Sequence, residues 1–307
     1  MTAEAAGGGA EPLRERIGLI AGYGVFPFLV VEGARRQGLD VAVAAIRGEA
    51  NPELARHASA IQWIWVSQIS KTIRFFQKCG VKRCTMAGKV HKVKMYSWRK
   101  IFWFLLDYRA VRLWWRARWN RKDDALLGAV ADALESGGIH LMDSTHLVKD
   151  LLAKRGILTR RQPDAREMRD VRYGWTLAKE MGRLDIGQTV IVKDAAVLAV
   201  EAIEGTDEAI RRGGRLGKGG IVVVKVAKPR QDMRFDVPAI GPDTIRTLKD
   251  VQASVLAIEA EKTLILEPEE TIRLADEEDI AIVALDKTLI DAMGSPEGAR
   301  SEPEDPK

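Results

Sequence analysis

Cysteine is nearly absent from this sequence of 307 residues, which contains only Cys79 and Cys84. Two cysteines at this spacing supply neither a disulfide framework nor the ligands of a zinc site. We expect both to be small core residues of a protein that works in a reducing compartment.

Long apolar runs are absent as well. The longest one in the aromatic-rich part of the chain, residues 101–106, is far shorter than the roughly 18 residues that a membrane-spanning helix requires. Residues 1–13 have neither the basic start nor the apolar centre of a secretory signal. We therefore expect no spanning segment and no signal peptide, and we interpret residues 1–13 and 291–307 as disordered tails.

The remaining composition is typical of a globular protein, with 46% hydrophobic residues and a net charge of +5 that suggests acidic partners. The length allows two modest domains. We predict an α/β fold with a Rossmann-like parallel-sheet domain at residues 14–148, a linker at 149–163, and a second α/β or α+β domain at 164–290.

Residues 16–46 predict a strand, a glycine loop, a helix and a second buried strand, which together form a βαβ unit. The loop contains Gly22, Tyr23 and Gly24 and opens the helix, so its backbone N–H groups favour an anion such as a nucleotide phosphate. A tight turn without a ligand is the alternative.

The dinucleotide-binding fingerprint is incomplete in this loop, because Pro27 stands where its third glycine would be. Arg47 and Gly48 occupy the end of the second strand, where an NAD enzyme places a carboxylate for the ribose. Both observations argue against a hydride-transfer cofactor.

A later strand is expected to end at Ala87, Gly88 and Lys89. In open parallel sheets, ligands bind outside the carboxyl ends of the strands, so this end and the glycine loop are predicted to line one crevice. Lys89 is then a candidate contact for a diphosphate or carboxylate, or else a simple surface lysine.

Residues 89–122 interleave many basic and aromatic residues with a single acid, Asp107. This composition suits a helix on an anionic bilayer surface, a single-stranded nucleic acid, or tryptophans packed in the core under arginine stems. We prefer the membrane surface or the core, because no RNA-binding motif accompanies the segment.

The β-branched run at residues 221–228 is interrupted by Lys225 and is typical of a strand buried on both faces. An unpaired buried ammonium is costly, so Lys225 requires an anionic partner, which is either a carboxylate or a ligand.

Residues 232–237 alternate strictly and predict a strand with Asp232, Arg234 and Asp236 on one face. Carboxylates beside a guanidinium suit an enzyme that handles phosphates and a divalent cation. A solvated, salt-bridged strand face is the alternative.

Glu201, Glu204 and Asp207 are concentrated just before the strand of Lys225. Thr206 is a good N-cap and Asp207 complements a first helical turn, so capping alone explains both of these residues. The three carboxylates are alternatively available to a metal ion.

Several motifs follow one another along the chain: GLIAGYG from Gly18, Ala87–Gly88, KDDALL from Lys122, GRLDIGQ from Gly182, VEAIEGTD from Val200, KVAKP from Lys225 and DVPAIG from Asp236. In this order the chain resembles, over residues 17–285, the UDP-2,3-diacylglucosamine pyrophosphatases of lipid A synthesis, in the form unrelated to calcineurin-like phosphoesterases.

The resemblance implies hydrolysis of the pyrophosphate bond of UDP-2,3-diacylglucosamine to UMP and 2,3-diacylglucosamine 1-phosphate (lipid X). Water would attack the β-phosphorus with the help of Mg²⁺ or Mn²⁺. The first domain would hold the nucleotide, and the second would hold the lipid and much of the catalytic machinery. It further implies a cytoplasmic enzyme on the inner-membrane surface, with no nucleic-acid partner, and it is compatible with a homodimer.

Asp236 matches the aspartate that is essential in the family. The residues and the resemblance together predict catalytic roles for Asp236, Lys225 and Asp207, and metal ligation by Asp236, Asp207 and Glu204. We assign the nucleotide to Gly22, Tyr23, Gly24, Ala87, Gly88, Lys89 and Asp124, and the phosphate and lipid to Gln188, Thr206, Lys228 and Gln231.

Two features depart from the family pattern: asparagine is frequent where this chain has Lys89, and residues 94–119, rich in Trp and Arg, are bulkier than usual. We therefore expect the uridine contacts or the acyl-chain preference to differ. Two other functions stay open on the sequence. One is a non-catalytic membrane or nucleic-acid binder built on residues 89–122, and the other is an enzyme of another reaction type that uses UDP-sugars, such as a transferase.

Overall fold

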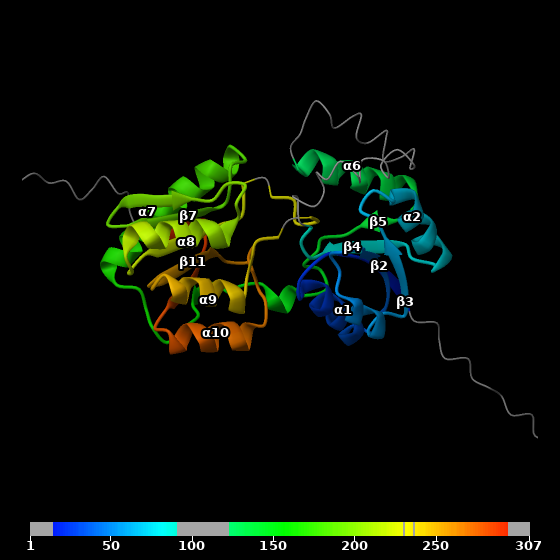
Figure 1. Cartoon of the computed structure of the whole chain (residues 1–307), viewed down its shortest axis with the longest axis horizontal. Coiled ribbons are helices and arrows are strands. Elements are labelled where there is room, and N and C mark those ends of the chain that lie inside the picture. Colours follow the sequence, from blue (N-terminus) through cyan, green and yellow to red (C-terminus); the bar gives the residue numbers. More distant parts are fainter. Residues whose placement is uncertain (1–14, 91–122, 230, 236, 294–307) are drawn as a thin grey trace, which may run out of the picture. The chain divides into compact units, whose positions relative to one another are not determined.

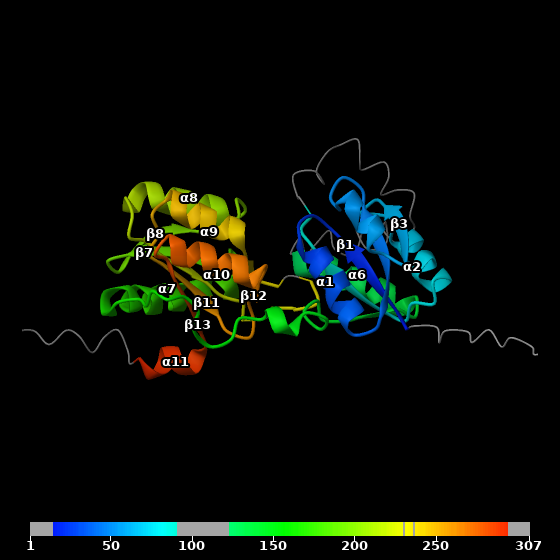
Figure 2. The same cartoon turned by 90° about the horizontal axis from the view of Figure 1, so that it is seen from below.

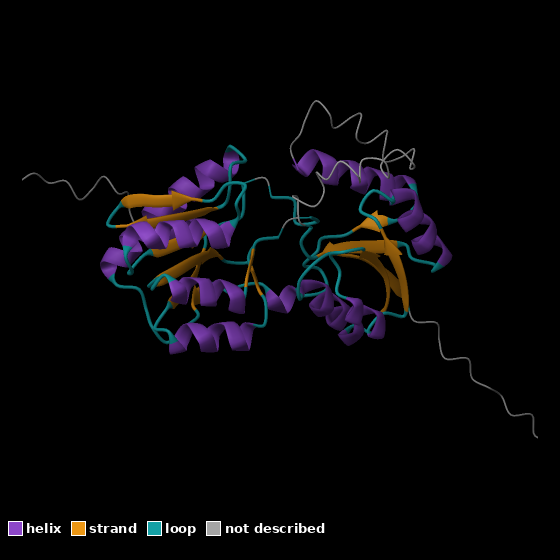
Figure 3. Ribbon diagram, viewed as in Figure 1, coloured by secondary structure: helices purple, strands orange, loops and turns teal. Residues whose placement is uncertain are grey.

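The computed structural model describes residues 15–90, 123–229, 231–235 and 237–293. The chain divides into two compact units, residues 1–148 and residues 149–307. Both combine helices with a β-sheet (Figures 1 and 3), which confirms the predicted α/β fold class.

The first unit is built on a five-stranded sheet with the order β3-β2-β1-β4-β5, in which all neighbours are parallel. The strands are β1 (Arg16–Ala21), β2 (Asp40–Ile46), β3 (Ala60–Ile64), β4 (Arg83–Ala87) and β5 (His140–Leu141). The chain order reverses between β1 and β4, so the carboxyl ends of these two strands form the switch point at which ligands bind in open α/β sheets.

Helices cover both faces of this sheet, with α1 (Phe26–Arg36) on one and α2 (Ile69–Lys78) and α6 (Asp123–Ser136) on the other (Figure 1). A short 3₁₀ helix, η1 (Pro52–Arg56), precedes β3. Leu19, Phe76 and Leu134 are fully buried between these layers. The helices pack on the sheet because their apolar residues recur at helical spacing.

The second unit is built on a six-stranded mixed sheet with the order β6-β13-β11-β9-β7-β8. Strands β9, β11 and β13 are parallel, whereas β6, β7 and β8 each run antiparallel to a neighbour. The strands are β6 (Gly156–Ile157), β7 (Thr189–Lys193), β8 (Ala196–Val200), β9 (Val222–Lys225), β11 (Val255–Glu259) and β13 (Ala281–Leu285). Separately, β10 (Ala239–Ile240) pairs in parallel with β12 (Leu264–Ile265).

Figure 2 shows that α8, α9 and α10 lie along one face of this sheet and that α7 and α11 lie on the other. Their bounds are α7 (Ala165–Arg183), α8 (Thr206–Gly217), α9 (Pro242–Asp250), α10 (Pro268–Glu277) and α11 (Lys287–Ala292). Each face has its own apolar core: Ile191 and Val223 pack with the helices of the first group, and Val190 and Val224 pack with those of the second. The alternation of side chains along the strands produces this division.

Residues 149–163, expected to form a linker, are instead hydrogen-bonded into the second unit. After the 3₁₀ helix η2 (Lys149–Leu151), Ala153 is fully buried and donates its N–H to the carbonyl of Thr263. Strand β6 then pairs antiparallel with β13. The segment was interpreted as a linker because most of its residues are charged or polar, and the few apolar residues that attach it to the sheet form no recognisable strand pattern.

The strand predicted at residues 232–237 is wrong for its described part, because residues 233–235 form a turn. The Arg234 guanidinium donates to both carboxylate oxygens of Asp232, and Phe235 donates its N–H to the carbonyl of Asp232. The guanidinium lowers the pKa of Asp232. Local bonds of this kind compete with strand pairing. Asp236 lies outside the described residues.

Candidate active site

The glycine loop and the end of β4 meet at the carboxyl edge of the first sheet. Gly22 donates its N–H to the carbonyl of Ala87 at 2.8 Å. Tyr23 and Lys89 form a β-bridge, with N–H to carbonyl distances of 2.7 and 2.9 Å. The structure therefore brings together the two segments that the sequence predicted to line one crevice.

Close backbone contact explains why two glycines stand here. A Cβ on Gly22 would lie 2.6 Å from the carbonyl oxygen of Lys89. Gly88 has a φ of +94°, and its Cβ would lie 2.7 Å from the carbonyl oxygen of Tyr23. Side chains at either position would push the two segments apart.

The same contacts limit how this edge can hold a phosphate. The N–H groups of Gly22 and Tyr23 donate to protein carbonyls, so they are not the anion donors that the sequence predicted. Helix α1 begins without a side-chain N-cap, and the side chains of Tyr23 and Lys89 are exposed. Asp124, also predicted to contact the nucleotide, is the second residue of α6, and its side chain lies outside the described part of the chain.

In the second unit, Lys225, Thr189 and Glu201 face one another across three neighbouring strands. Thr189 is paired with Lys225 in the register of β7 and β9. Glu201 donates its N–H to the carbonyl of Thr189 at 2.9 Å, one step beyond the registered pair of Val190 and Val200. Residues directly opposite on antiparallel strands share a face, so these three form one row.

The row lies on the face that α8 covers. The residues two positions away along each strand belong to the core beneath α8 and α9; they are Val223, Ile191 and Ala199. Because side chains alternate along strands, Lys225, Thr189 and Glu201 point the same way. The row thus occupies the edge of the sheet at which β9 ends and β7 begins.

Thr206, the first residue of α8, connects the two ends of this row. Lys225 donates from Nζ to Thr206 Oγ1 at 3.1 Å and to the carbonyl of Ala239 at 3.1 Å. Thr206 in turn donates its hydroxyl to Glu201 Oε1 at 2.9 Å. Lys225 is only 7% exposed, and the hydroxyl of Thr206 links its ammonium to the carboxylate of Glu201.

Thr206 was predicted to be the N-cap of α8, and this prediction is wrong. The N-cap is Gly205, with a φ of 87°, and Thr206 is already helical. Its hydroxyl is directed to Lys225 and Glu201 rather than to the backbone of the helix. Sequence reasoning counted Glu201 only as a carboxylate available to a metal, and it missed Thr189.

The carboxylates that were predicted to bind a metal differ in their surroundings. Glu204 forms an ion pair of 2.6 Å with Arg212, and its pKa is lowered by its own backbone N–H and by that guanidinium. Asp207 lies in the first turn of α8 and is only half-buried. Among the described residues, no group of three or more His, Cys, Asp or Glu side chains could hold a metal ion.

The loop after β9 contains two more predicted site residues. Lys228 forms an ion pair of 2.8 Å with Asp185, and its N–H is accepted by the side-chain oxygen of Gln231. Gln188 accepts a hydrogen bond from the N–H of Val226 through its backbone carbonyl. Its side-chain Oε1 is buried and has no partner among the described residues. These contacts place Gln188, Lys228 and Gln231 around the end of β9.

A second polar cluster, on the α7 face of the same edge, was not predicted. Glu259, the last residue of β11, is 5% exposed and forms ion pairs with Lys179 of α7 and with Lys262. It also accepts the N–H of Ala227 at 2.8 Å. Burial lowers the pKa of Lys179, and Glu259 opposes this shift. Lys179 and Glu259 are far apart in the sequence, so no local pattern revealed the pair.

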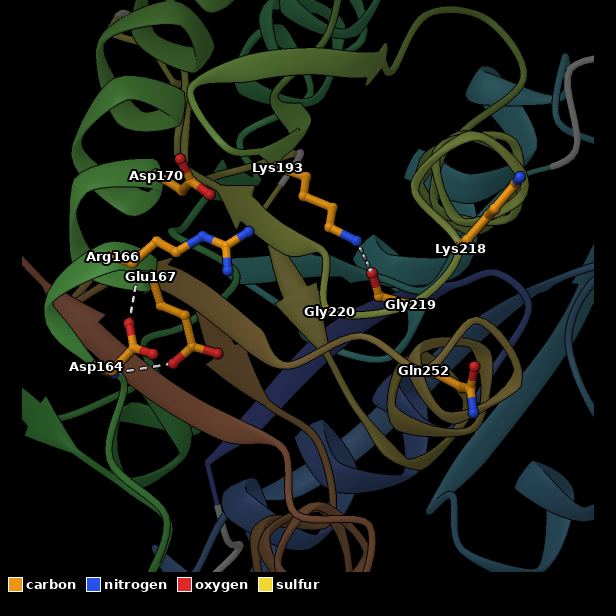
Figure 4. A pocket seen from close by; sticks show the side chains of 9 residues that line it. All are labelled: Asp164, Arg166, Glu167, Asp170, Lys193, Lys218, Gly219, Gly220 and Gln252. Atoms are coloured by element: carbon orange, nitrogen blue, oxygen red, sulfur yellow. Dashed lines mark hydrogen bonds between the residues drawn. The ribbon is translucent and has the colours of Figure 1, made fainter.

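A cavity of about 430 Å³ lies near the turn between β7 and β8, at the opposite end of β7 (Figure 4). Lys193 donates to the carbonyls of Gly217 and Gly219 at the end of α8. The carboxylate of Asp170 accepts the N–H groups of Asp194 and Ala195 in the hairpin turn. These groups stabilise the hairpin and the helix end, and no predicted site residue lines this cavity.

Comparison with known proteins identifies the family. The profile of the LpxI N-terminal domain matches residues 16–151, and that of the LpxI C-terminal domain matches residues 154–283. The chain belongs to the LpxI family. A curated relative from Caulobacter vibrioides (strain ATCC 19089 / CIP 103742 / CB 15) is the UDP-2,3-diacylglucosamine pyrophosphatase LpxI, 30% identical over 262 residues that cover 81% of this chain and 90% of the relative. Its name is that of a hydrolase of a pyrophosphate bond, and the family expected from the sequence is confirmed.

Solved structures resemble this LpxI-family chain only distantly. UDP-glucose-4-epimerase (galE) from Stenotrophomonas maltophila, with bound NAD and formylated UDP-arabinopyranose, is 13% identical with a TM-score of 0.24, covering 39% of this chain and 34% of that chain. Phosphoribosylglycinamide synthetase from Anaerococcus prevotii is 10% identical with a TM-score of 0.24, and the match covers 58% of this chain and 32% of that chain. Neither likeness bears on function.

Proposed function

We propose that this protein hydrolyses the pyrophosphate bond of UDP-2,3-diacylglucosamine to UMP and 2,3-diacylglucosamine 1-phosphate. The observation that carries the proposal is the buried link from Lys225 through Thr206 to Glu201 at one edge of the second sheet, in a chain of the LpxI family. A buried ammonium needs negative charge nearby, and one that hydrogen bonds already hold in place can bind an anionic substrate without being reoriented.

The chemistry of the site suits phosphoryl transfer. Cleavage of a pyrophosphate requires neutralisation of the charge that develops on the phosphate oxygens, and a fixed cation supplies this without reorganisation. Lys225 would hold the diphosphate from the end of β9. Lys228 and Gln188 flank the same strand end and would bind the outer phosphate oxygens.

A divalent cation such as Mg²⁺ belongs to the proposal. Mg²⁺ takes carboxylate oxygens and keeps several waters, so one or two carboxylates suffice to hold it. Asp207 fits this role, because its carboxylate is half-buried and forms no ion pair with a described residue. Asp236 would be the other ligand, and Glu204 is excluded from the proposed set because Arg212 holds it. The ion would neutralise phosphate charge.

We propose that the enzyme works at the cytoplasmic surface of the inner membrane, because its diacylated substrate resides there. Across the described residues, no helix is both long and apolar enough to cross a bilayer. The basic aromatic residues 91–122, which lie outside the described part, would provide the peripheral contact. A homodimer remains compatible with this placement, and no nucleic acid is invoked.

The test is an assay with purified full-length protein, UDP-2,3-diacylglucosamine in detergent micelles, and Mg²⁺. UMP and the monophosphate lipid should appear in equal amounts, EDTA should stop the reaction, and added Mg²⁺ should restore it. Asp236→Ala should remove turnover while the melting temperature stays unchanged. Absence of cleavage by the wild-type protein would refute the function, and binding of UDP without hydrolysis would point to another enzyme of UDP-sugars.

A further inference from the structure

We propose that Glu201, together with Thr189, holds the water molecule that attacks the substrate, and that Glu201 takes the proton of this water. The inference deepens the proposed pyrophosphatase function and rests on it. It gives a catalytic role to a residue that sequence reasoning had treated only as a potential metal ligand.

The first observation is an oxygen without a partner. Glu201 is 9% exposed, and its Oε1 accepts the hydroxyl of Thr206. Its Oε2 is buried and has no hydrogen-bond partner among the described residues. A buried carboxylate oxygen requires a hydrogen-bond donor, because leaving it without one is costly.

The second observation is a hydroxyl of the same kind beside it. Thr189 is fully buried, and its Oγ1 also has no hydrogen-bond partner among the described residues. Thr189 lies between Glu201 and Lys225 in the row across β8, β7 and β9. A water molecule placed there would donate to Glu201 Oε2 and bond to Thr189 Oγ1.

The position of this water is set by the chain of hydrogen bonds described above. Thr206 donates to Oε1 and thereby fixes the rotation of the carboxylate, which leaves Oε2 as the acceptor. Lys225 donates to the same hydroxyl. The water and the ammonium therefore belong to one rigid group, so a phosphate bound at Lys225 lies next to the nucleophile.

The water oxygen forms a bond to the β-phosphorus as one of its protons moves to Glu201 Oε2. The bond between that phosphorus and the bridging oxygen breaks, and the electron pair leaves with UMP. Glu201 then returns its proton to solvent. General base catalysis of this kind contributes about 10²–10⁴-fold to a rate.

The experiment compares three variants in the micelle assay. Glu201→Gln keeps an acceptor for Thr206 but removes the base, and we expect kcat to fall at least about 100-fold with KM within about threefold. Thr189→Val keeps the shape of a buried β-branched residue and removes the hydroxyl, and we expect kcat to fall about tenfold with an unchanged melting temperature. Glu208→Gln is the matched control, because it is the same substitution at a nearby glutamate, which lies in α8 and pairs with Arg211 on the exposed side.

The outcomes separate this inference from the proposed function. If the wild-type protein does not cleave the substrate, the function itself fails. If it does cleave and Glu201→Gln keeps its kcat, or loses only affinity, the role of Glu201 is refuted. If Glu201→Gln does not fold, Thr189→Val provides the test. A normal kcat in Thr189→Val would show that this row does not hold the attacking water.

Discussion

The carboxylate of Glu259, at the end of β11, accepts the backbone N–H of Ala227 at 2.8 Å, just beyond the end of the neighbouring strand β9. Lys179, which pairs with Glu259, donates to the carbonyl of the same Ala227 at 2.9 Å. The backbone N–H and the backbone carbonyl of Ala227, two positions after Lys225, are thus both held by hydrogen bonds. The loop that continues to Lys228 therefore starts from a rigid point, although its own residues form irregular structure.

Replacing Glu259 by alanine should lower the free energy of unfolding by about 1–3 kcal/mol, because the partly buried ammonium of Lys179 and the N–H of Ala227 would both lose their carboxylate acceptor. Urea denaturation followed by circular dichroism measures this loss. Adding Lys179→Met to the first change should recover part of it.

Glu270→Ala is the control for this cluster, since Glu270 forms an exposed pair with Arg273. Its cost should stay below about 1 kcal/mol. Equal losses in Glu259→Ala and Glu270→Ala would show that the buried cluster does not carry the stability assigned to it.

Local sequence patterns predicted much of this structure. The glycines at positions 22 and 88 were expected to share a crevice because parallel strands place their carboxyl ends together, and the β-bridge between Tyr23 and Lys89 confirms the meeting of these segments. Lys225 was expected to be buried because it interrupts a β-branched run, and it is.

What the sequence did not reveal depends on register and on distant partners. Thr189 faces Lys225 only because β7 and β9 pair at one particular register, which no local pattern encodes. The pairing of Lys179 with Glu259 likewise requires knowledge of which helix covers which face. The alternation at residues 232–235 predicted a strand, but the short-range pairing of Arg234 with Asp232 stabilises a turn instead.

Gly88→Ala should lower the stability of the first unit by more than the free energy that an alanine costs in the left-handed backbone conformation. Gly80 provides the comparison, since its φ is +71° and nothing lies within 4 Å of its Cβ position. Gly80→Ala should cost about 1–2 kcal/mol. Gly88→Ala should cost more, because its Cβ would meet the carbonyl oxygen of Tyr23 at 2.7 Å, and it should also weaken UMP binding in isothermal titration calorimetry. Indistinguishable melting curves and UMP affinities for the two variants would contradict the close approach of the segments.

Cys84 should be inert to thiol reagents in the folded protein, whereas Cys79, which is less buried, should react. Burial, and to a lesser extent the charge of Glu135, raises the pKa of the Cys84 thiol from 9.0 to about 12. A disulfide-exchange reagent should therefore titrate one thiol in native protein at pH 8 and two in denaturant.

The same shift predicts a loss of stability in alkali. Below about pH 9 the thiol is protonated in both states, so it adds no pH dependence. Between pH 9 and about 12 the unfolded chain loses this proton before the folded one does, so the contribution of Cys84 to stability declines as the pH rises. Cys84→Ala should show a smaller decline over this window in urea titrations, after allowance for its lower starting stability. An equal decline in both proteins would exclude Cys84 as its source.

The bridge from Lys225 through Thr206 should tolerate the loss of a methyl group but not of the hydroxyl. Thr206→Ser keeps an oxygen that donates to Glu201 and accepts from Lys225, so kcat should stay within about threefold of wild type. Thr206→Val keeps the volume and removes both bonds, which leaves the ammonium of Lys225 and the carboxylate of Glu201 without their common partner. We expect a loss of about 1–3 kcal/mol in the free energy of unfolding and a fall in kcat of about 10–100-fold. Steady-state kinetics and urea denaturation on both variants provide the measurement, and a valine variant as active and stable as the serine variant would show that the hydroxyl does not organise the site.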